Sequence, residues 1–139
     1  MKLKSIFIIA FFTFFNCSEK TEPTLQSCNE CVLVNNTLFN ETKTTNYTIT
    51  NVVLIDNFLT ITISSSGCNA ASWKATLIDA NQILESNPIQ RNLKVLLENN
   101  EACLAVFEKD FTFNIQKLKE NQDAIILNLE GWDNQINYN

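Results

Sequence analysis

The stretch CNEC holds the most closely spaced pair of cysteines in the sequence, Cys28 and Cys31. This C-x-x-C spacing occurs in redox enzymes, whose reactive thiolate needs a helix N-terminus or a nearby cation to lower its pKa. Here Glu30 lies inside the motif, and a neighbouring carboxylate raises the pKa of a thiol. We therefore predict a small structural disulfide, with a thiol oxidoreductase as the alternative.

Cys68 and Cys103 are the other two cysteines that follow Cys17. Four cysteines in an exported chain allow three ways of forming two disulfides. We favour a local pair between Cys28 and Cys31 and a long-range pair between Cys68 and Cys103. The long-range bridge is expected to stabilise the fold by roughly 3 to 4 kcal/mol, because it restricts the unfolded chain.

Residue types that enzymes commonly use are scarce in this chain. Histidine is absent, which excludes Ser-His-Asp and Cys-His nucleophiles and every imidazole metal site. Two glycines leave no room for a glycine-rich phosphate loop. A glycoside hydrolase with paired carboxylates remains an alternative, although nothing in the sequence distinguishes one pair. We predict no catalytic residue, no cofactor and no metal site.

The first 16 residues have the layout of a secretory signal, with Lys2 and Lys4 ahead of an apolar run over residues 6–15. Ten helical residues rise only about 15 Å against a hydrocarbon core of roughly 30 Å, so the run is too short to span a bilayer. The stretch Phe14-Phe15-Asn16-Cys17 resembles a bacterial lipobox, in which Cys17 would receive a diacylglycerol. It departs from the usual pattern at Asn16, and an ordinary secretory signal is the alternative.

These features divide the chain into a signal peptide (residues 1–16), a lipidated cysteine with a polar tether (17–27) and one domain (28–139). Acyl chains on Cys17 would hold the protein to a membrane, since each buried CH₂ contributes about 0.8 kcal/mol. Without Lys2 and Lys4, the net charge of −5 becomes −7. An acidic chain with a single arginine, Arg91, has no footprint for nucleic acid.

Alternating apolar residues predict an all-β fold. The pattern is clearest over residues 58–65 and 111–115, and Asp56-Asn57 joins the first of these to a strand over 47–55. Further strands are predicted at residues 32–39, 73–78, 92–97, 103–107 and 125–130. Seven to eight short strands indicate an antiparallel β-sandwich, Ig-like in its general architecture.

Two local predictions accompany this fold. The stretch ATLIDANQILES has near-helical spacing of its apolar residues, so a helix over residues 75–86 is an alternative to a strand there. In SGCNAASW, Gly67 is expected to permit a turn or bulge, and Trp73 is expected to pack near the Cys68–Cys103 bridge.

Candidate binding residues come from a loop and from an aromatic residue near the C-terminus. The polar stretch ESNPIQR between predicted strands contributes Glu85, Asn87, Gln90 and Arg91, because recognition tends to lie on loops of a rigid scaffold. Trp132 beside Asp133 and Asn134 could stack on a sugar, and packing in the core is the alternative for it.

The chain resembles small lipoproteins of Bacteroidetes, especially flavobacteria. The resemblance rests on the signal ending in Cys17, an L-T-I-T-I-S strand running into S-G-C, the E-S-x-P-x-Q stretch, Cys103 and an F-x-F-x-I strand. It implies a β-rich fold and an outer-membrane lipoprotein of the cell envelope, facing the periplasm or the cell surface. It implies no specific function.

We therefore expect a membrane-anchored, non-enzymatic binding or structural module of the cell envelope. Its partners would be the membrane, through the lipid, and an envelope protein or a glycan. The sequence does not fix the oligomeric state.

Overall fold

Eight strands form two sheets over residues 29–139, the part of the chain that this computed structural model describes. The predicted signal peptide, Cys17, the tether and Cys28 lie outside these residues. The predicted all-β sandwich is confirmed, as is the expected number of strands. The elements are β1 (Cys31–Val34), α1 (Asn36–Glu41), β2 (Thr48–Ile55), β3 (Phe58–Gly67), β4 (Lys74–Leu84), β5 (Ile89–Glu98), β6 (Ala105–Asn114), α2 (Gln116–Lys119), β7 (Ile125–Leu129) and β8 (Ile136–Tyr138).

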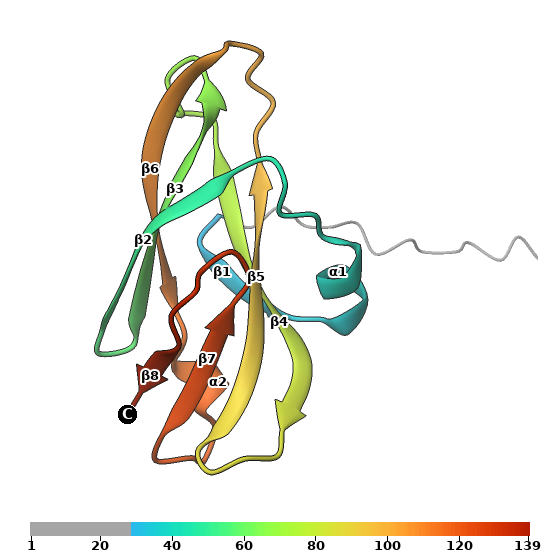
Figure 1. The fold of residues 1–139 in the computed structure, drawn as a ribbon, viewed down its shortest axis with the longest axis vertical. Coiled ribbons are helices and arrows are strands. Elements are labelled where there is room, and N and C mark those ends of the chain that lie inside the picture. Colours follow the sequence, from blue (N-terminus) through green and yellow to red (C-terminus); the bar gives the residue numbers. More distant parts are fainter. Residues whose placement is uncertain (1–28) are drawn as a thin grey trace, which may run out of the picture.

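The strands are ordered β1-β4-β5-β7-β8 in a five-stranded sheet and β2-β3-β6 in a three-stranded sheet (Figure 1). The prediction of a purely antiparallel sandwich is wrong, because β1 pairs with β4 in parallel and so does β5 with β7. In both cases the intervening chain passes through the three-stranded sheet before it returns. Alternation in a sequence shows which residues face the core, but it does not show strand direction.

The core lies between the two sheets and is built from alternate residues of each strand. Leu59, Ile61 and Ile63 of β3 are fully buried, while Thr60 between them bonds the hydroxyl of Thr112 across the outer face. The hairpin between β2 and β3 turns at Asp56, whose φ is 52°, as the sequence predicts for this pair of strands.

The stretch that has helical spacing in the sequence is strand β4, so the helical alternative over residues 75–86 is wrong. Six successive residues, 75–80, are buried, because β4 is covered on both faces. The sandwich core covers one face. Helix α1 covers the other, where its Leu38 is buried and Asn36 Nδ2 donates to the Ala80 carbonyl at 2.9 Å. A strand buried on both faces shows no period of two.

The predicted strand over residues 32–39 is wrong beyond Val34. The Asn35 side chain accepts the N–H of Leu38 at 3.0 Å and thereby caps helix α1. The chain consequently leaves the sheet after four residues and places Leu38 over β4.

The predicted strands over residues 103–107 and 111–115 are one strand, β6, paired with β3 from Ala105 to Asn114. Lys109 occupies an inward-facing position of β6. Its charge interrupts the apolar alternation, so the sequence pattern predicts two strands in place of one. Its ammonium leaves the core and donates to the carbonyls of Ala70 at 3.0 Å and Trp73 at 2.9 Å. The short strand β8 was not predicted.

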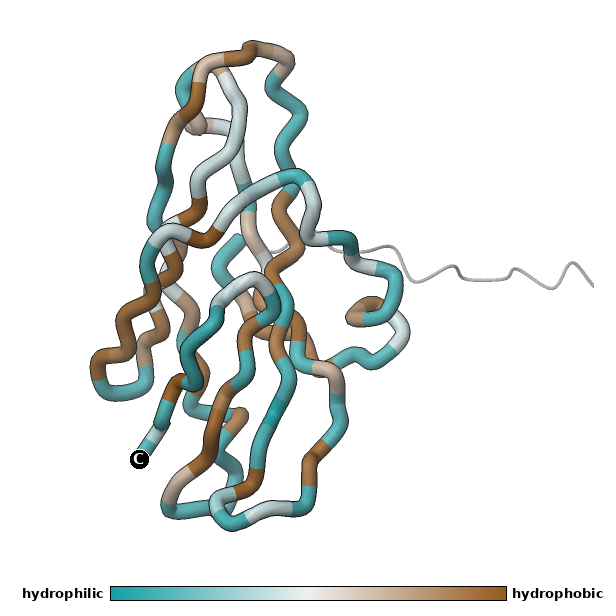
Figure 2. The backbone as a smooth tube through the Cα atoms, in the orientation of Figure 1, coloured by the Kyte–Doolittle hydropathy of each residue, from teal (hydrophilic) through white to brown (hydrophobic). Residues whose placement is uncertain are grey.

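Strand β6 is an edge of the three-stranded sheet. Near the start of this strand Leu104 and Val106 are 91% and 72% exposed. Hydrophobic residues also flank the turn of the β2–β3 hairpin, where Ile55 and Phe58 are exposed (Figure 2). On the edge itself, the Thr112 N–H donates to the Glu30 carboxylate at 3.4 Å.

Candidate functional site

The candidate binding site is a cleft of about 330 Å³ beside Trp132, lined by carboxamide and aromatic side chains, which we call the Trp132 cleft. It lies on the outer face of the five-stranded sheet, between helix α1 and the loop that joins β7 to β8. Its lining residues are Phe39, Asn92, Leu93, Asn128, Leu129, Glu130, Trp132, Asp133, Asn134 and Gln135. Carboxamides make up four of these ten side chains, and aromatic rings contribute two.

Local backbone geometry places the indole in this cleft. Gly131 has a φ of +86°, a conformation that side-chain-bearing residues rarely adopt. The Trp132 N–H then donates to the Leu129 carbonyl at 3.1 Å, so the chain turns back over the sheet after β7. Trp132 is partly buried and packs against the core with part of its surface. The predicted packing against the core therefore applies to part of the indole, and the stacking of its remaining surface on a sugar stays a prediction.

Carboxamide side chains form a connected row across β5 and β7 in the floor of the cleft. Asn128 Nδ2 donates to Gln90 Oε1 at 3.0 Å and to Asn92 Oδ1 at 3.3 Å. Gln135 Nε2 in turn donates to Asn128 Oδ1 at 3.4 Å. Each carboxamide carries both donors and acceptors, so the row presents mixed hydrogen-bonding groups on a rigid sheet.

Charge in the cleft comes from Glu130 and Asp133. Glu130 Oε2 lies 3.1 Å from Lys94 Nζ, and its Oε1 accepts the hydroxyl of Thr44 at 2.9 Å. Lys94 Nζ also lies 4.5 Å from the centre of the Phe39 ring. Glu130 therefore anchors the wall of the cleft, and Asp133 is exposed beside Trp132.

The five predicted binding residues do not lie together. Glu85 and Asn87 are exposed in the β4–β5 loop, ahead of β5, whereas the Trp132 cleft contacts Asn92 and Leu93 in the middle of that strand. Gln90 belongs to β5 and reaches the cleft through Asn128. Trp132 lines the cleft and Gln90 borders it through Asn128, whereas Glu85 and Asn87 lie apart from both.

The prediction that Arg91 is a loop residue available to a ligand is wrong. Arg91 lies in β5 and is 3% exposed. Its Nε and Nη2 donate to the two Asp79 carboxylate oxygens at 2.8 and 3.1 Å, and Nη1 donates to Glu120 at 3.0 Å. The hydrogen bonds that Arg91 donates to Asp79, more than any other contact, raise the pKa of Arg91 above its ordinary value. The guanidinium is therefore held in an internal ion pair.

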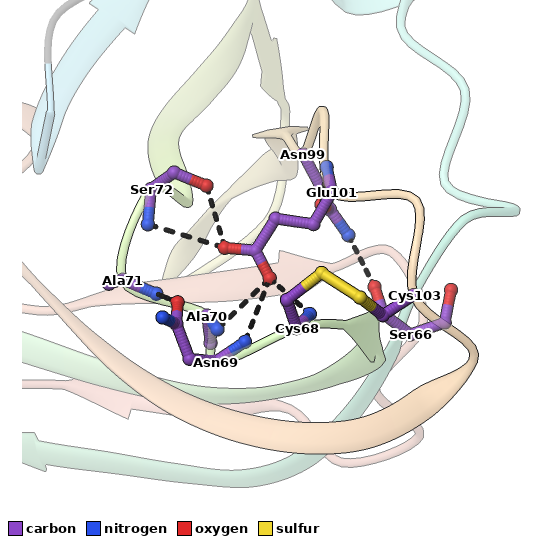
Figure 3. Close-up of a disulfide and its surroundings, with 9 residues drawn as sticks. All are labelled: Ser66, Cys68, Asn69, Ala70, Ala71, Ser72, Asn99, Glu101 and Cys103. Carbon is purple, nitrogen blue, oxygen red and sulfur yellow. Dashed lines mark hydrogen bonds between the residues drawn. A yellow bond between two sulfur atoms is a disulfide. The ribbon is translucent and has the colours of Figure 1, made fainter.

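A disulfide joins Cys68 to Cys103 with a Cα–Cα distance of 4.9 Å, as predicted (Figure 3). The two cysteines lie in the connections β3–β4 and β5–β6, which both cross between the sheets at the upper end of Figure 1. Cys31 is also disulfide-bonded. Cys28, the partner predicted for it, lies outside the described residues, so that pairing stays a prediction.

Glu101 makes a second link between the same two crossings. Its Oε2 accepts the backbone N–H groups of Cys68, Asn69 and Ala70 at 2.6, 3.1 and 3.1 Å (Figure 3). Its Oε1 accepts the Ser72 hydroxyl at 2.7 Å. The hydrogen bond from the Ser72 side chain, followed by the backbone N–H groups, lowers the pKa of Glu101 from 4.5 to about 2.

Gly67 is needed for this arrangement in a way that the sequence did not predict. It ends β3, and its φ is not positive, so the predicted turn or bulge is not its role. A Cβ at this position would lie 2.5 Å from Glu101 Oε2 and 2.9 Å from Trp73 Cζ2. Trp73 itself is 1% exposed in the core, as predicted, and its indole lies next to Gly67, the residue before Cys68.

The stability that the Glu101 carboxylate contributes to the fold is expected to be lost at acid pH. A carboxyl whose pKa is lower in the folded than in the unfolded protein stabilises the fold above the unfolded pKa, and this contribution is lost as the pH falls towards the folded pKa. Urea midpoints of the wild type and of Glu101→Gln should therefore differ at pH 7 and converge between pH 4.5 and about 2. Glu108→Gln, on the exposed face of β6, is the matched control. A constant difference at all pH values would contradict the assignment.

The comparisons with known proteins identify the fold. No protein-family model and no curated protein matches the chain. The structure is similar to that of a protein of unknown function, DUF1344, from Bacteroides vulgatus, with a TM-score of 0.51 and 11% identity over 79% of this chain and 54% of that one. A "Putative TOXIN related protein" from Parabacteroides distasonis gives a TM-score of 0.49 and 13% identity, over 79% and 59% of the two chains.

The chain thus spans little more than half the length of these two structures. At such low identity the first similarity shows the fold alone. Within residues 29–139, no three side chains of the metal-binding types lie close enough to hold an ion. Neither helix in that range is long and apolar enough to cross a membrane.

Sequence reasoning missed Asn92, Asn128, Gln135 and Phe39 as cleft residues. Asparagine is depleted in strands, so an Asn at an outward position of two predicted strands was the available signal. Phe39 carried no such signal, because it was assigned to a strand rather than to α1.

Proposed function

We propose that the chain is a lipid-anchored, non-enzymatic binding module of the bacterial cell envelope, and that the Trp132 cleft is its binding site. The signal-like N-terminus followed by Cys17 supports the anchor. The resemblance to Bacteroidetes lipoproteins supports the outer membrane as its location, facing the periplasm or the cell surface.

The observation that carries the binding role is the combination of a partly exposed indole with a row of connected carboxamides. Binding sites are concave, contain aromatic surface and place a small number of polar groups that fix orientation. The cleft has about 330 Å³ of space, at the lower end of the volumes typical of such sites. Its floor is a paired sheet, which keeps the polar groups in place without a ligand.

A carboxylate-based hydrolase is the second candidate, because Glu130 and Asp133 both line the cleft. A glycosidase of this type uses both carboxyls, one as general acid and the other as nucleophile or general base. Both oxygens of Glu130 already accept bonds, from Thr44 and Lys94. This occupancy favours a binding role over turnover.

The full chain, expressed in a Gram-negative host with its signal, is expected to sediment with membranes, whereas Cys17→Ser is expected to remain in the soluble fraction. Acyl chains on the N-terminal cysteine of the protein, detected by mass spectrometry, would confirm the anchor. An uncleaved and unmodified N-terminus would overturn it.

The cleft is tested with the same full chain, solubilised in detergent and immobilised. It is expected to retain polysaccharide extracted from bacterial envelopes, and Trp132→Ala is expected to weaken retention about tenfold. Leu104→Ala is the matched control, because it removes an exposed apolar side chain at a distance. Equal retention by Trp132→Ala and wild type would exclude the cleft. Release of shortened saccharides, abolished in Asp133→Asn, would instead establish the hydrolase.

A further inference from the structure

The charged groups around the Trp132 cleft disfavour anionic glycans. Glu130 and Asp133 place negative charge on its lining. The cation that lies closest is Lys94, which already contacts Glu130 at 3.1 Å and the Phe39 ring at 4.5 Å. Because Lys94 compensates the charge of Glu130, Asp133 is the uncompensated charge of the lining. A uronate or a sulfated sugar would therefore bring its negative charge towards the Asp133 carboxylate, with the Lys94 ammonium already paired.

The uncharged groups of the cleft favour hydroxyl-rich ligands. The cleft contains the carboxamides of Asn92, Asn128 and Gln135. One hydrogen bond of 3.3 Å joins Asn128 to Asn92, and one of 3.4 Å joins Gln135 to Asn128. Each group keeps further donor or acceptor capacity after these bonds. A sugar hydroxyl both donates and accepts, so successive hydroxyls can extend the row without leaving a buried polar group unpaired.

The indole supplies the complementary apolar contact. A pyranose ring has a face of C–H groups that packs on an aromatic surface, and Trp132 offers the largest such surface in the cleft. A volume of about 330 Å³ holds one or two sugar rings rather than a longer oligosaccharide.

On the basis of the proposed function, we infer that the cleft binds a neutral saccharide, taking one or two sugar residues of a glycan and selecting against acidic ones. Trp132 stacks on the ring, the carboxamide row binds the hydroxyls, and Asp133 sets the charge selectivity. Asp133 therefore determines specificity while the indole supplies affinity.

The test uses the detergent-solubilised full chain and four probes: neutral trisaccharides of glucose, mannose and N-acetylglucosamine, and trigalacturonate. Binding is followed by calorimetry and by tryptophan fluorescence. At least one neutral probe is expected to bind about tenfold more tightly than trigalacturonate. That preference should narrow as the salt concentration rises, because salt screens the repulsion between exposed charges.

Asp133→Lys is expected to raise the affinity for trigalacturonate, relative to that for the neutral probes, about threefold to fivefold. Asp123→Lys is the matched control, since Asp123 is exposed ahead of β7, at the opposite end of that strand from the cleft. Trp132→Phe keeps an aromatic ring and most of the packing, and it should weaken neutral binding without loss of folding, as judged by circular dichroism.

The outcomes separate this inference from the proposed function. Tighter binding of trigalacturonate, with dependence on Trp132, would overturn the neutral-ligand inference and leave the binding module intact. An equal effect of Asp133→Lys and Asp123→Lys would overturn the role of Asp133. No binding of any probe, together with unaltered envelope retention by Trp132→Ala, would remove both proposals.

Discussion

Replacing Asp79 with Ala is expected to lower the free energy of unfolding by about 3–5 kcal/mol, because it leaves Arg91 charged inside the protein. Asp79 and Arg91 are 0% and 3% exposed, and two hydrogen bonds join them. Removal of the carboxylate leaves Nε and Nη2 without partners, and Glu120 on the exposed side reaches only Nη1. The loss is measured by urea unfolding followed by circular dichroism.

The double variant Asp79→Leu/Arg91→Met distinguishes the effect of the ion pair on stability from the effect of the volume that the two side chains fill. A buried pair replaced by apolar residues of similar volume is often neutral in stability, so the double variant should be considerably more stable than Asp79→Ala. Lys94→Met is the matched control for an ion pair nearer the surface, with side chains 12% and 44% exposed. It should cost within about 1 kcal/mol. A loss below about 1 kcal/mol in Asp79→Ala would show that water reaches Arg91.

Replacement of Cys68 and Cys103 by Ser together is expected to lower the free energy of unfolding by about 3–4 kcal/mol. The bridge spans 35 residues, and closing a loop of this size restricts the unfolded chain by about that amount. The double variant avoids the free thiol that a single replacement would leave. Variants are preferable to a reductant here, because Cys31 is also disulfide-bonded.

Glu101 is expected to keep the β3–β4 crossing ordered when the disulfide is removed. Its carboxylate holds the β3–β4 crossing through the N–H groups of Cys68, Asn69 and Ala70, and this contact does not require the bridge. We expect the double variant to keep its native circular dichroism spectrum while its urea midpoint falls. A midpoint equal to that of the wild type would mean that Glu101 and Lys109 alone fix the crossings.

The sequence predicted the sandwich because most of its strands have one buried face. Leu59, Ile61 and Ile63 alternate with polar residues, and that period determines both the strand and its inward face. The bridge between Cys68 and Cys103 was predictable because Cys28 and Cys31 are close together in the sequence and were paired locally, which leaves Cys68 and Cys103 to pair with each other. Trp132 was a candidate because it lies beside Asp133 and Asn134, and the sequence left packing in the core as its alternative.

What the sequence concealed depends on contacts between distant segments. Lys109 interrupts the apolar alternation of β6. Its ammonium binds the carbonyls of Ala70 and Ala71, which lie 39 and 38 residues earlier in the sequence. Arg91 reads as a polar loop residue until Asp79 is placed beside it in the neighbouring strand. The carboxamide row needs the pairing of β5 with β7, and no local pattern specifies a parallel pair of strands separated by the other sheet.

The unpaired edge of β6 also bears on how the molecule behaves at high concentration. An open edge with Leu104 and Val106 near its start invites another chain to add a strand. Two copies that met there in antiparallel fashion, centred on Lys109, would bring Glu108 of each against Asp110 of the other, and like charges placed directly opposite repel. The acidic outer face of this strand therefore opposes edge-to-edge pairing of two copies in this register, while Leu104 and Val106 stay exposed.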